Sequence, residues 1–317
     1  METLRMSHEY VLITGCSGML GNAVMTELEQ QGIKTIGIDI RISSNQTNCV
    51  QVDVNDIHAL HRLMRQHVIT RIVHCGALSG PMVEVNNPYH IFNVNVAGTV
   101  NLLEISRIYK IKRFVYCSST SVYGDTRDLA CSAEGISEAV RLCPRSVYGA
   151  TKAAAERMLD GYRSQHGVDG VSVRLCWVYG SGRTTPEPIK MALESALQGT
   201  PLEFEWGIGF PRQYIYIRDA AQALTLACMA PTVARSCYNA TSGESPTLDV
   251  IMESIQEVVP QLSVKLSHGN DPLDDYQDKF DISAIGTDIG FYPQYSLKKG
   301  VQEYLALLSQ GALDGRR

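Results

Sequence analysis

Residues Tyr10–Thr14 read Y-V-L-I-T, and they lead directly into the run Gly15-Cys-Ser-Gly18-Met-Leu-Gly21. The first five form a short apolar, β-branched stretch, which suits a buried parallel strand. Leu20, Val24 and Leu28 then fall on one stripe of a predicted helix. A strand, a glycine turn and a helix in this order predict the phosphate-binding turn of a dinucleotide site.

Each glycine of this turn has an expected role. Gly15 allows the tight turn, Gly18 lets the backbone approach a pyrophosphate at the helix N-terminus, and Gly21 lets the helix pack on the strand. The spacing G-x-x-G-x-x-G is one residue longer than G-x-G-x-x-G. The residues between the glycines that are expected to contact the same cofactor are Ser17, Met19 and Leu20.

The acidic residue that follows the next strand indicates which dinucleotide binds. The predicted strand Thr35–Ile38 ends at Asp39, eighteen residues after Gly21. A carboxylate at this place accepts hydrogen bonds from the adenosine ribose hydroxyls and repels a 2′-phosphate. NAD is therefore predicted rather than NADP, and Arg41, two residues later, is the residue that could shift this preference.

A candidate proton-transfer pair lies at Tyr148–Lys152, which reads Y-G-A-T-K. A separation of four residues puts both side chains on one face of a helix. A free phenol, with a pKa of about 10, is a poor base at neutral pH, and a neighbouring ammonium group favours its ionised form. The pair can therefore move a proton on and off an alcohol.

These motifs, with the serine run Cys117-Ser-Ser-Thr-Ser-Val-Tyr-Gly124, resemble the extended short-chain dehydrogenase/reductase family, in its NAD-dependent epimerase/dehydratase branch. The likeness extends nearly end to end, through His74–Ala77, Asn93–Thr99, Arg174–Gly180, Arg212–Asp219, Tyr238–Gly243 and Gly290–Leu297. The resemblance implies that Tyr148 is the base, that Lys152 assists it and binds the nicotinamide ribose, and that Ser119 binds the substrate oxygen.

The same resemblance implies two sets of binding residues. Those expected at the cofactor, besides the glycine turn, Asp39, Tyr148 and Lys152, are Asp53, Val54, Cys75, Gly76, Ala77, Asn95 and Cys117. Those expected at the substrate are Ser79, Ser119, Thr120, Ser121, Tyr148, Trp177, Arg183 and Arg212. No metal ligands are expected.

Two departures from the family pattern bear on the reaction. Dehydratase members carry Asp and Glu where this chain has Thr120 and Ser121, so dehydration is disfavoured. Many nucleotide-sugar enzymes carry, where this chain has Trp177, an Asn that helps to hold the diphosphate. Arg183 and Arg212 remain candidates to bind an anion, either a diphosphate or a sugar-acid carboxylate.

The predicted function is therefore that of an NAD-dependent epimerase acting on a sugar, with a nucleotide sugar ahead of other substrates. An NAD-dependent dehydrogenase of a free sugar or sugar acid is the first alternative. A catalytically silent NAD-binding protein is the second, and the intact set of Ser119, Tyr148 and Lys152 argues against it.

Strand and helix patterns alternate as far as about residue 178, with further strands expected at Val50–Asp53, Arg71–Cys75, Phe114–Cys117 and Val171–Trp177. This rhythm predicts an α/β fold with a doubly wound parallel (Rossmann) sheet. By resemblance, residues 1–178 and 212–240 form the NAD-binding domain. Residues 179–211 and 241–317 form a smaller, C-terminal substrate-binding lobe, and an acidic loop is expected at Asp271–Asp281.

Composition excludes several other classes of protein. The 317 residues contain 28 Lys and Arg against 33 Asp and Glu, a net charge of −5, which does not favour a nucleic-acid partner. No apolar run approaches the roughly 18 residues of a membrane span, and no signal peptide is apparent. The nine cysteines include no C-x-x-C pair and fit buried thiols of a cytoplasmic protein. The resemblance implies a homodimer through helices at residues 89–109 and 147–166.

Overall fold

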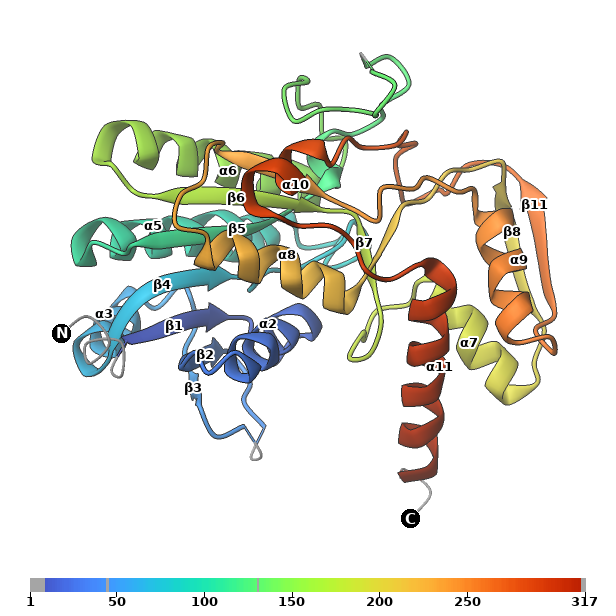
Figure 1. Cartoon of the computed structure of the whole chain (residues 1–317), viewed down its shortest axis with the longest axis horizontal. Coiled ribbons are helices and arrows are strands. Elements are labelled where there is room, and N and C mark those ends of the chain that lie inside the picture. Colours follow the sequence, from blue (N-terminus) through green and yellow to red (C-terminus); the bar gives the residue numbers. More distant parts are fainter. Residues whose placement is uncertain (1–8, 44–45, 130, 315–317) are drawn as a thin grey trace.

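The computed structural model describes residues 9–43, 46–129 and 131–314, and its main sheet has seven parallel strands in the order β10-β6-β5-β4-β1-β2-β3 (Figure 1). The strands are β1 (Glu9–Thr14), β2 (Thr35–Asp39), β3 (Cys49–Gln51), β4 (Val68–His74), β5 (Arg113–Ser119), β6 (Gly170–Leu175) and β10 (Cys237–Ala240). All neighbouring pairs are parallel, and the order reverses beside β1. The predicted doubly wound fold is confirmed.

Helices cover both faces of this sheet, which explains why its central strands are mostly buried. On β1, the side chains of Val11 and Ile13 pack with helices α2 and α8, whereas Leu12 packs on the opposite face. The helices on the first face are α2 (Met19–Gln30), α8 (Ile217–Met229) and α10 (Ser283–Ile289), and those on the second are α3 (Ile57–Gln66), α5 (Gly98–Tyr109) and α6 (Val147–His166). A short helix α4 (Pro88–Phe92) and a π-helical turn (Asn93–Ala97) precede α5.

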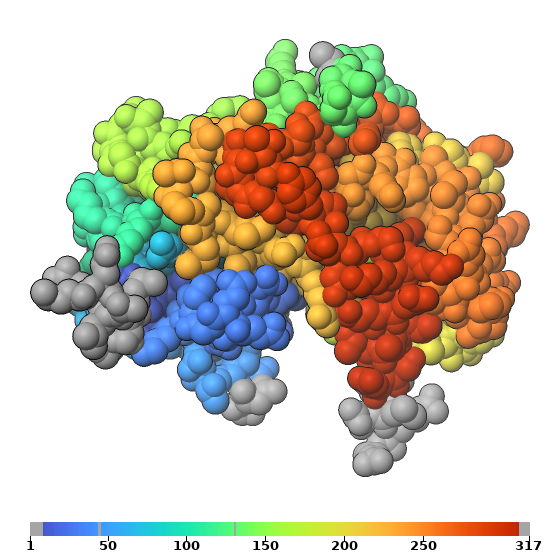
Figure 2. Space-filling model, in the orientation of Figure 1, coloured from blue at the N-terminus to red at the C-terminus, as the bar shows by residue number. Residues whose placement is uncertain are grey.

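A second core lies beyond the carboxyl ends of the strands. It is formed by α7 (Pro188–Gln198), α9 (Leu248–Val258), α11 (Leu297–Asp314) and a two-stranded parallel sheet of β8 (Leu202–Ile208) and β11 (Val264–His268). In Figure 2, α11 projects from this part of the molecule. The division of the chain at residues 178, 212 and 241 remains a proposal. Within 241–317, α10 contributes Ala284 and Ile285 to the core of the main sheet.

The strand expected at Val171–Trp177 is two strands in the structure. β6 ends at Leu175, and β7 (Trp177–Tyr179) pairs with β9 (Tyr214–Tyr216) in a separate two-stranded sheet. The Trp177 N–H donates to the Gln213 carbonyl over 3.2 Å, so the backbone of β7 is satisfied outside the main sheet. The chain thereby passes from the main sheet toward the second core at the edge where the strands end.

The acidic stretch Asp271–Asp281 crosses back to the main sheet without forming a helix. The Gln277 side chain donates to the Thr120 carbonyl over 2.8 Å, and Ile136 forms a β-bridge with Phe280. The C-terminal part of the chain therefore supports the turn that follows β5. Within the described ranges, no helix is both long and apolar enough to cross a membrane.

Candidate functional site

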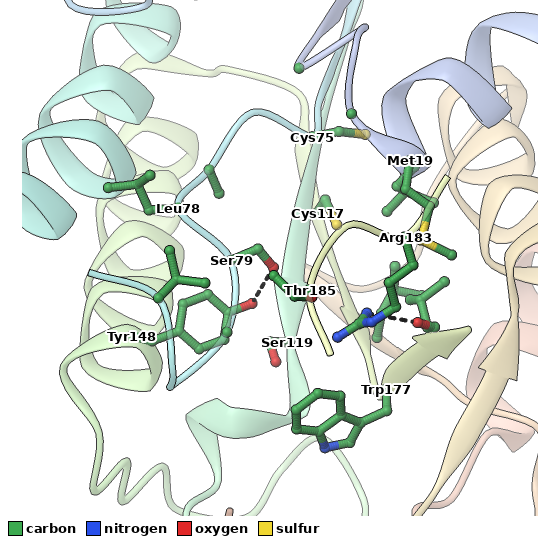
Figure 3. Close-up of a pocket in the computed structure, with 18 of the residues that line it drawn as sticks. Met19, Cys75, Leu78, Ser79, Cys117, Ser119, Tyr148, Trp177, Arg183 and Thr185 are labelled. Carbon is green, nitrogen blue, oxygen red and sulfur yellow. Dashed lines mark hydrogen bonds between the residues drawn. The ribbon is translucent and has the colours of Figure 1, made fainter. Parts of the chain in front are cut away.

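A cavity of about 380 Å³ opens where β1, β4, β5 and β6 end (Figure 3). The predicted site residues that line it are Gly15, Ser17, Gly18, Met19, Leu20, Gly21, Cys75, Ala77, Ser79, Cys117, Ser119, Thr120, Ser121, Tyr148, Lys152, Trp177 and Arg183. The predicted site residues outside this lining are Asp39, Asp53, Val54, Gly76, Asn95 and Arg212. The carboxyl end of a parallel sheet is where ligands bind in this fold class.

The glycine turn leaves space that side chains would fill. Gly15 has a φ of +69°, and a Cβ atom there would lie 2.7 Å from the Gly76 Cα atom. A Cβ atom at Gly21 would lie 2.1 Å from the Gly15 carbonyl oxygen. Helix α2 begins after Gly18 without a side-chain cap, so its first N–H groups remain available to an anion. These residues fit the pyrophosphate of a dinucleotide.

The residues expected around adenosine lie beyond the cavity lining. The Asp39 carboxylate accepts hydrogen bonds from the backbone N–H groups of Ser17 and Arg41, each over 3.2 Å, and so lies beside the glycine turn. Asp53 is exposed and accepts a hydrogen bond from the Asn55 N–H, and Val54 is buried against α5. Their contacts with a cofactor remain predictions.

Tyr148 and Lys152 stand in the first turns of α6, which Ser146 caps by accepting a hydrogen bond from the Gly149 N–H. The Tyr148 hydroxyl lies 3.3 Å from the Ser79 hydroxyl, as Figure 3 shows. The buried Lys152 Nζ donates to the Cys117 carbonyl over 2.7 Å. This bond fixes the lysine between α6 and the end of β5.

The charge of Lys152 is maintained despite its burial. Burial alone would lower the pKa of Lys152, but the facing phenols of Tyr116 and Tyr148 and the Cys117 thiol together raise that pKa above its usual value. The Lys152 Nζ atom lies 5.9 Å from the centroid of the Tyr148 ring. The site therefore holds an ammonium group beside the phenol, as the motif predicts.

The serine run forms a tight turn at the end of β5. The Ser119 hydroxyl donates to the Ser121 hydroxyl and accepts a hydrogen bond from the Ser121 N–H, both over 3.1 Å. Thr120, between them, is buried, and its carbonyl accepts the bond from Gln277. Ser119 and Tyr148 thus reach the same cavity from β5 and α6, two elements that the sequence separates.

A buried chain of hydrogen bonds behind the cavity positions two of the predicted cofactor residues. The Gly76 N–H donates to the Thr14 hydroxyl, which lies 2.6 Å from His74 Nδ1. His74 Nε2 lies 3.0 Å from the Thr99 hydroxyl, which donates to the Asn95 carbonyl. Burial lowers the pKa of His74 to about 3, with a further contribution from Lys152, so the ring is neutral. Because the Thr99 hydroxyl donates to the Asn95 carbonyl, it accepts the bond from His74. The proton of the neutral His74 ring is therefore on Nε2, and Nδ1 accepts from the Thr14 hydroxyl.

Asn95 does not line the cavity, but its side chain fixes a loop that does. Its side chain accepts a hydrogen bond from the Leu78 N–H, donates to the Leu78 carbonyl, and donates to the Thr151 hydroxyl. It therefore ties the loop after β4 to α6. Because Ser79 follows in this loop, Asn95 positions the partner of the Tyr148 hydroxyl.

Trp177 separates the two candidate anion-binding arginines. Its Nε1–H donates to the Asp274 carboxylate over 2.6 Å, and its ring centroid lies 5.3 Å from the Arg183 guanidinium and 4.6 Å from that of Arg212. Arg212 is 3% exposed and is paired with Asp271 and Asp274. The structure therefore places Arg183 in the cavity wall and Arg212 behind Trp177, where carboxylates of the chain itself neutralise it.

Sequence analysis did not identify several of the lining residues. They are Leu78, Gly80, Pro81, Val83, Ser118, Leu175, Cys176, Val178, Gly182, Thr184 and Thr185. Thr184 and Thr185 lie between β7 and α7, where Gly, Pro and Thr cluster. Among the described residues, no group of His, Cys, Asp and Glu suits a metal ion, and the nine cysteines are free thiols.

Known proteins resemble this chain in fold over nearly its whole length. A UDP-glucuronate 4-epimerase from Thermodesulfobacterium geofontis is 24% identical over 92% of this chain and 94% of its own. The solved structure of Thermotoga maritima UDP-glucose 4-epimerase with UDP-glucose superposes with a TM-score of 0.84 at 21% identity, over 96% of this chain and 99% of that one. Thermus thermophilus UDP-glucose 4-epimerase, solved with NAD, gives a TM-score of 0.82 at 25% identity, over 94% and 98%.

The family-level match covers most of the chain. Residues 11–240 match the model of the NAD dependent epimerase/dehydratase family. This range runs from the first strand of the main sheet to its last, β10. The chain therefore belongs to the NAD dependent epimerase/dehydratase family.

Proposed function

We propose that this protein is an NAD-dependent epimerase that acts on a sugar by transient oxidation and re-reduction at a carbinol carbon. The observation that carries the proposal is the arrangement of Tyr148, Lys152 and Ser119 in one cavity beside the glycine turn. The family uses NAD, and its members named above are epimerases of nucleotide sugars. A carbinol with its hydroxyl at Tyr148 would meet a base, a cation and an orienting hydroxyl together.

Different residues of this chain bind the cofactor, transfer the proton and orient the substrate. The glycine turn and the first N–H groups of α2 hold the pyrophosphate, and Asp39 binds the adenosine ribose. When bound, NAD supplies the acceptor for the hydrogen that leaves the carbinol carbon. Tyr148 accepts the hydroxyl proton and later returns it, with Lys152 stabilising the phenolate. Ser119 orients the substrate oxygen.

Elimination of water has little support in this cavity. Thr120 and Ser121 stand where dehydratases carry an acid and a base, and neither has a carboxyl group. In the described part of the chain, no Asp, Glu or His side chain lines the cavity. Proton removal at a neighbouring carbon followed by loss of hydroxide needs such a group, so oxidation and reduction at one carbon is favoured.

A second candidate is an NAD-dependent dehydrogenase of a free sugar or sugar acid. The observation that favours it is that Trp177 stands in the cavity wall where many nucleotide-sugar enzymes have an asparagine. An indole there cannot replace an amide as a ligand of a diphosphate, and its N–H is already bonded to Asp274. A free sugar has no diphosphate, so it would need neither an amide nor the indole N–H at this position.

One assay separates the two candidates. An epimerase returns its hydride to the same sugar, so NAD should copurify and absorbance near 340 nm should stay flat while the substrate is converted. A dehydrogenase must release NADH, so absorbance should rise in proportion to substrate consumed. Product formation followed by NMR alongside absorbance would decide between them. Turnover of no sugar by either readout would favour a silent NAD-binding protein.

Cofactor preference tests the assignment of Asp39. We expect NAD to bind at least about tenfold, or 1.4 kcal/mol, more tightly than NADP, because a carboxylate repels a 2′-phosphate. Asp39→Ala should narrow this gap. Fluorescence titration of both cofactors measures it, and equal affinities in the unaltered protein would mean that Arg41 outweighs the carboxylate.

The same proposal includes a homodimer. Exposed apolar side chains lie on α4 and α6, among them Tyr89, Phe92, Val147 and Met158. A second copy packed against these helices would remove them from water.

A further inference from the structure

Charged side chains are scarce in the cavity wall, and this limits what the substrate can carry. Among the lining residues in the described ranges, Lys152 and Arg183 are the only basic side chains, and there is no Asp, Glu or His. Lys152 is buried, donates to the Cys117 carbonyl and lies beside the Tyr148 ring. Arg183 is therefore the cation left for an anionic group of the substrate.

The region behind Arg183 carries no surplus positive charge. Arg212 is paired with two carboxylates, those of Asp271 and Asp274. Glu187 is 2% exposed and caps α7, and the nearby Arg183 opposes the rise in the pKa of Glu187 that burial causes. Lys190, which donates to the Arg183 carbonyl, is itself paired with Glu194, so the three cations Arg183, Arg212 and Lys190 stand beside four carboxyl groups on this side of the cavity.

A diphosphate would be poorly held in such surroundings. It brings about two negative charges, and partly buried anions need cations or several N–H donors to offset lost hydration. The Trp177 N–H is bonded to Asp274, and the Arg212 guanidinium is bonded to the two aspartates. Arg183 by itself can form one bidentate pair, which neutralises a single carboxylate but leaves about one negative charge of a diphosphate unpaired.

Arg183 is prepared for such a pair. Its Nη1 donates to the Val178 carbonyl over 2.9 Å, and its guanidinium carbon lies over the Trp177 ring. Among the described residues, its buried Nε–H has no hydrogen-bond partner, and no carboxylate lies within ion-pair distance of the guanidinium. Figure 3 shows the guanidinium extending into the cavity from the side opposite Tyr148.

We infer that the substrate is a free sugar acid whose single carboxylate pairs with Arg183 while its carbinol lies at Tyr148 and Ser119, and that no nucleoside diphosphate is bound. The inference rests on the proposed oxidation of a carbinol and names the substrate class for it. It holds for epimerisation and for net oxidation alike, because both begin with the same hydroxyl.

Binding and turnover should be measured together on the NAD-loaded protein. The sugar-acid probes are D-glucuronate, D-galacturonate and D-gluconate, and the diphosphate probes are UDP, UDP-glucose and UDP-glucuronate. Calorimetric titration into the inactive Tyr148→Phe variant reports binding alone, and absorbance near 340 nm with NMR of the sugar reports turnover. We expect at least one sugar acid to bind and react, and UDP not to bind at millimolar concentration.

Substitution of Arg183 tests where the carboxylate lies. Arg183→Met keeps the stem over Trp177 and removes the charge, and should weaken binding of the sugar acid by about 10- to 100-fold. It should raise KM by a similar factor with a smaller change in kcat. Arg183→Lys should bind the sugar acid more tightly than Arg183→Met, because it restores the charge but not the paired N–H donors of a guanidinium. Arg157→Met is the matched control, since Arg157 is exposed on α6 and pairs with Asp160, and it should change neither quantity.

Three results would overturn the inference. They are binding of UDP, turnover of a UDP-sugar without turnover of any sugar acid, and binding of a sugar acid that Arg183→Met leaves intact. The second would leave the proposed carbinol oxidation standing and change only the substrate class. Binding of a sugar acid through Arg183 with no turnover of any probe would have the opposite meaning, because it would support the inference and count against the proposed reaction.

Discussion

Replacement of Tyr148 by Phe should lower kcat by at least about a hundredfold, since a positioned acid–base group contributes roughly 10²- to 10⁴-fold. The change deletes the proton acceptor and leaves the ring, which is 7% exposed, in its place on α6. The Ser79 hydroxyl loses its partner but is exposed and can bond to water. The affinity for NAD should therefore stay within about threefold of the unaltered protein. Steady-state kinetics with a fluorescence titration of NAD would measure both.

Tyr162 provides a matched control on the same helix. Its hydroxyl donates to Glu104 and does not line the cavity, so Tyr162→Phe should leave turnover nearly unchanged. If Tyr148→Phe kept about a tenth of the activity, Tyr148 would not be the base. A loss of NAD binding equal to the loss of turnover would indicate damage to the cofactor site instead.

Replacement of Arg212 by Met should lower the free energy of unfolding by about 3–5 kcal/mol, the usual cost of leaving buried partner charges unpaired. Methionine retains an apolar stem between the rings of Trp177 and Trp206, which lie 4.6 Å and 5.1 Å from the guanidinium. What is lost is the charge that offsets Asp271 and Asp274. Denaturant unfolding followed by circular dichroism measures the change.

The dependence of this loss on pH has a definite sign. Burial already raises the pKa of Asp274, while Arg212 lowers it, so removal of the arginine raises the folded-state pKa further. A carboxyl group whose folded pKa is raised is stabilising while protonated and loses that contribution as pH rises through its unfolded pKa of about 4 and beyond. The Arg212→Met variant should therefore be closer to the unaltered protein at low pH than at pH 7.

Arg235 is the comparison for a solvent-exposed pair. Its side chain is 56% exposed and pairs with Asp288 over 3.2 Å, so Arg235→Met should cost less than about 1 kcal/mol. If Arg212→Met cost no more than Arg235→Met, the Arg212 guanidinium would not be committed to the two aspartates. It would then be available to a ligand, as the sequence first suggested.

Local sequence patterns predicted the dinucleotide half well. The apolar run before Gly15 and the stripe on α2 specify a strand and helix whose neighbours lie close in the chain. The parallel, doubly wound sheet followed from the alternation of strands and helices. The i, i+4 spacing likewise placed Tyr148 and Lys152 together, because α6 spans residues 147–166 as expected.

Side chains that meet across long sequence separations were not predictable in this way. The partners of Arg212, Asp271 and Asp274, lie about sixty residues later in a stretch with no periodicity. The end of β6 at Leu175 was missed because Trp177 is as apolar as the strand before it, and only pairing with β9 separates them. Thr184 and Thr185 line the cavity because the chain leaves the main sheet after β6 and continues through β7.

The link between the turn after β5 and the stretch near residue 280 also bears on biosynthesis. The main sheet is complete once β10, which ends at Ala240, has left the ribosome. The Thr120 carbonyl and Ile136 gain their partners, Gln277 and Phe280, about forty residues later. We expect a nascent chain arrested between these points to hold its serine turn by the local Ser119–Ser121 bonds alone, so the support from the C-terminal segment would be the last part of the site to form in synthesis.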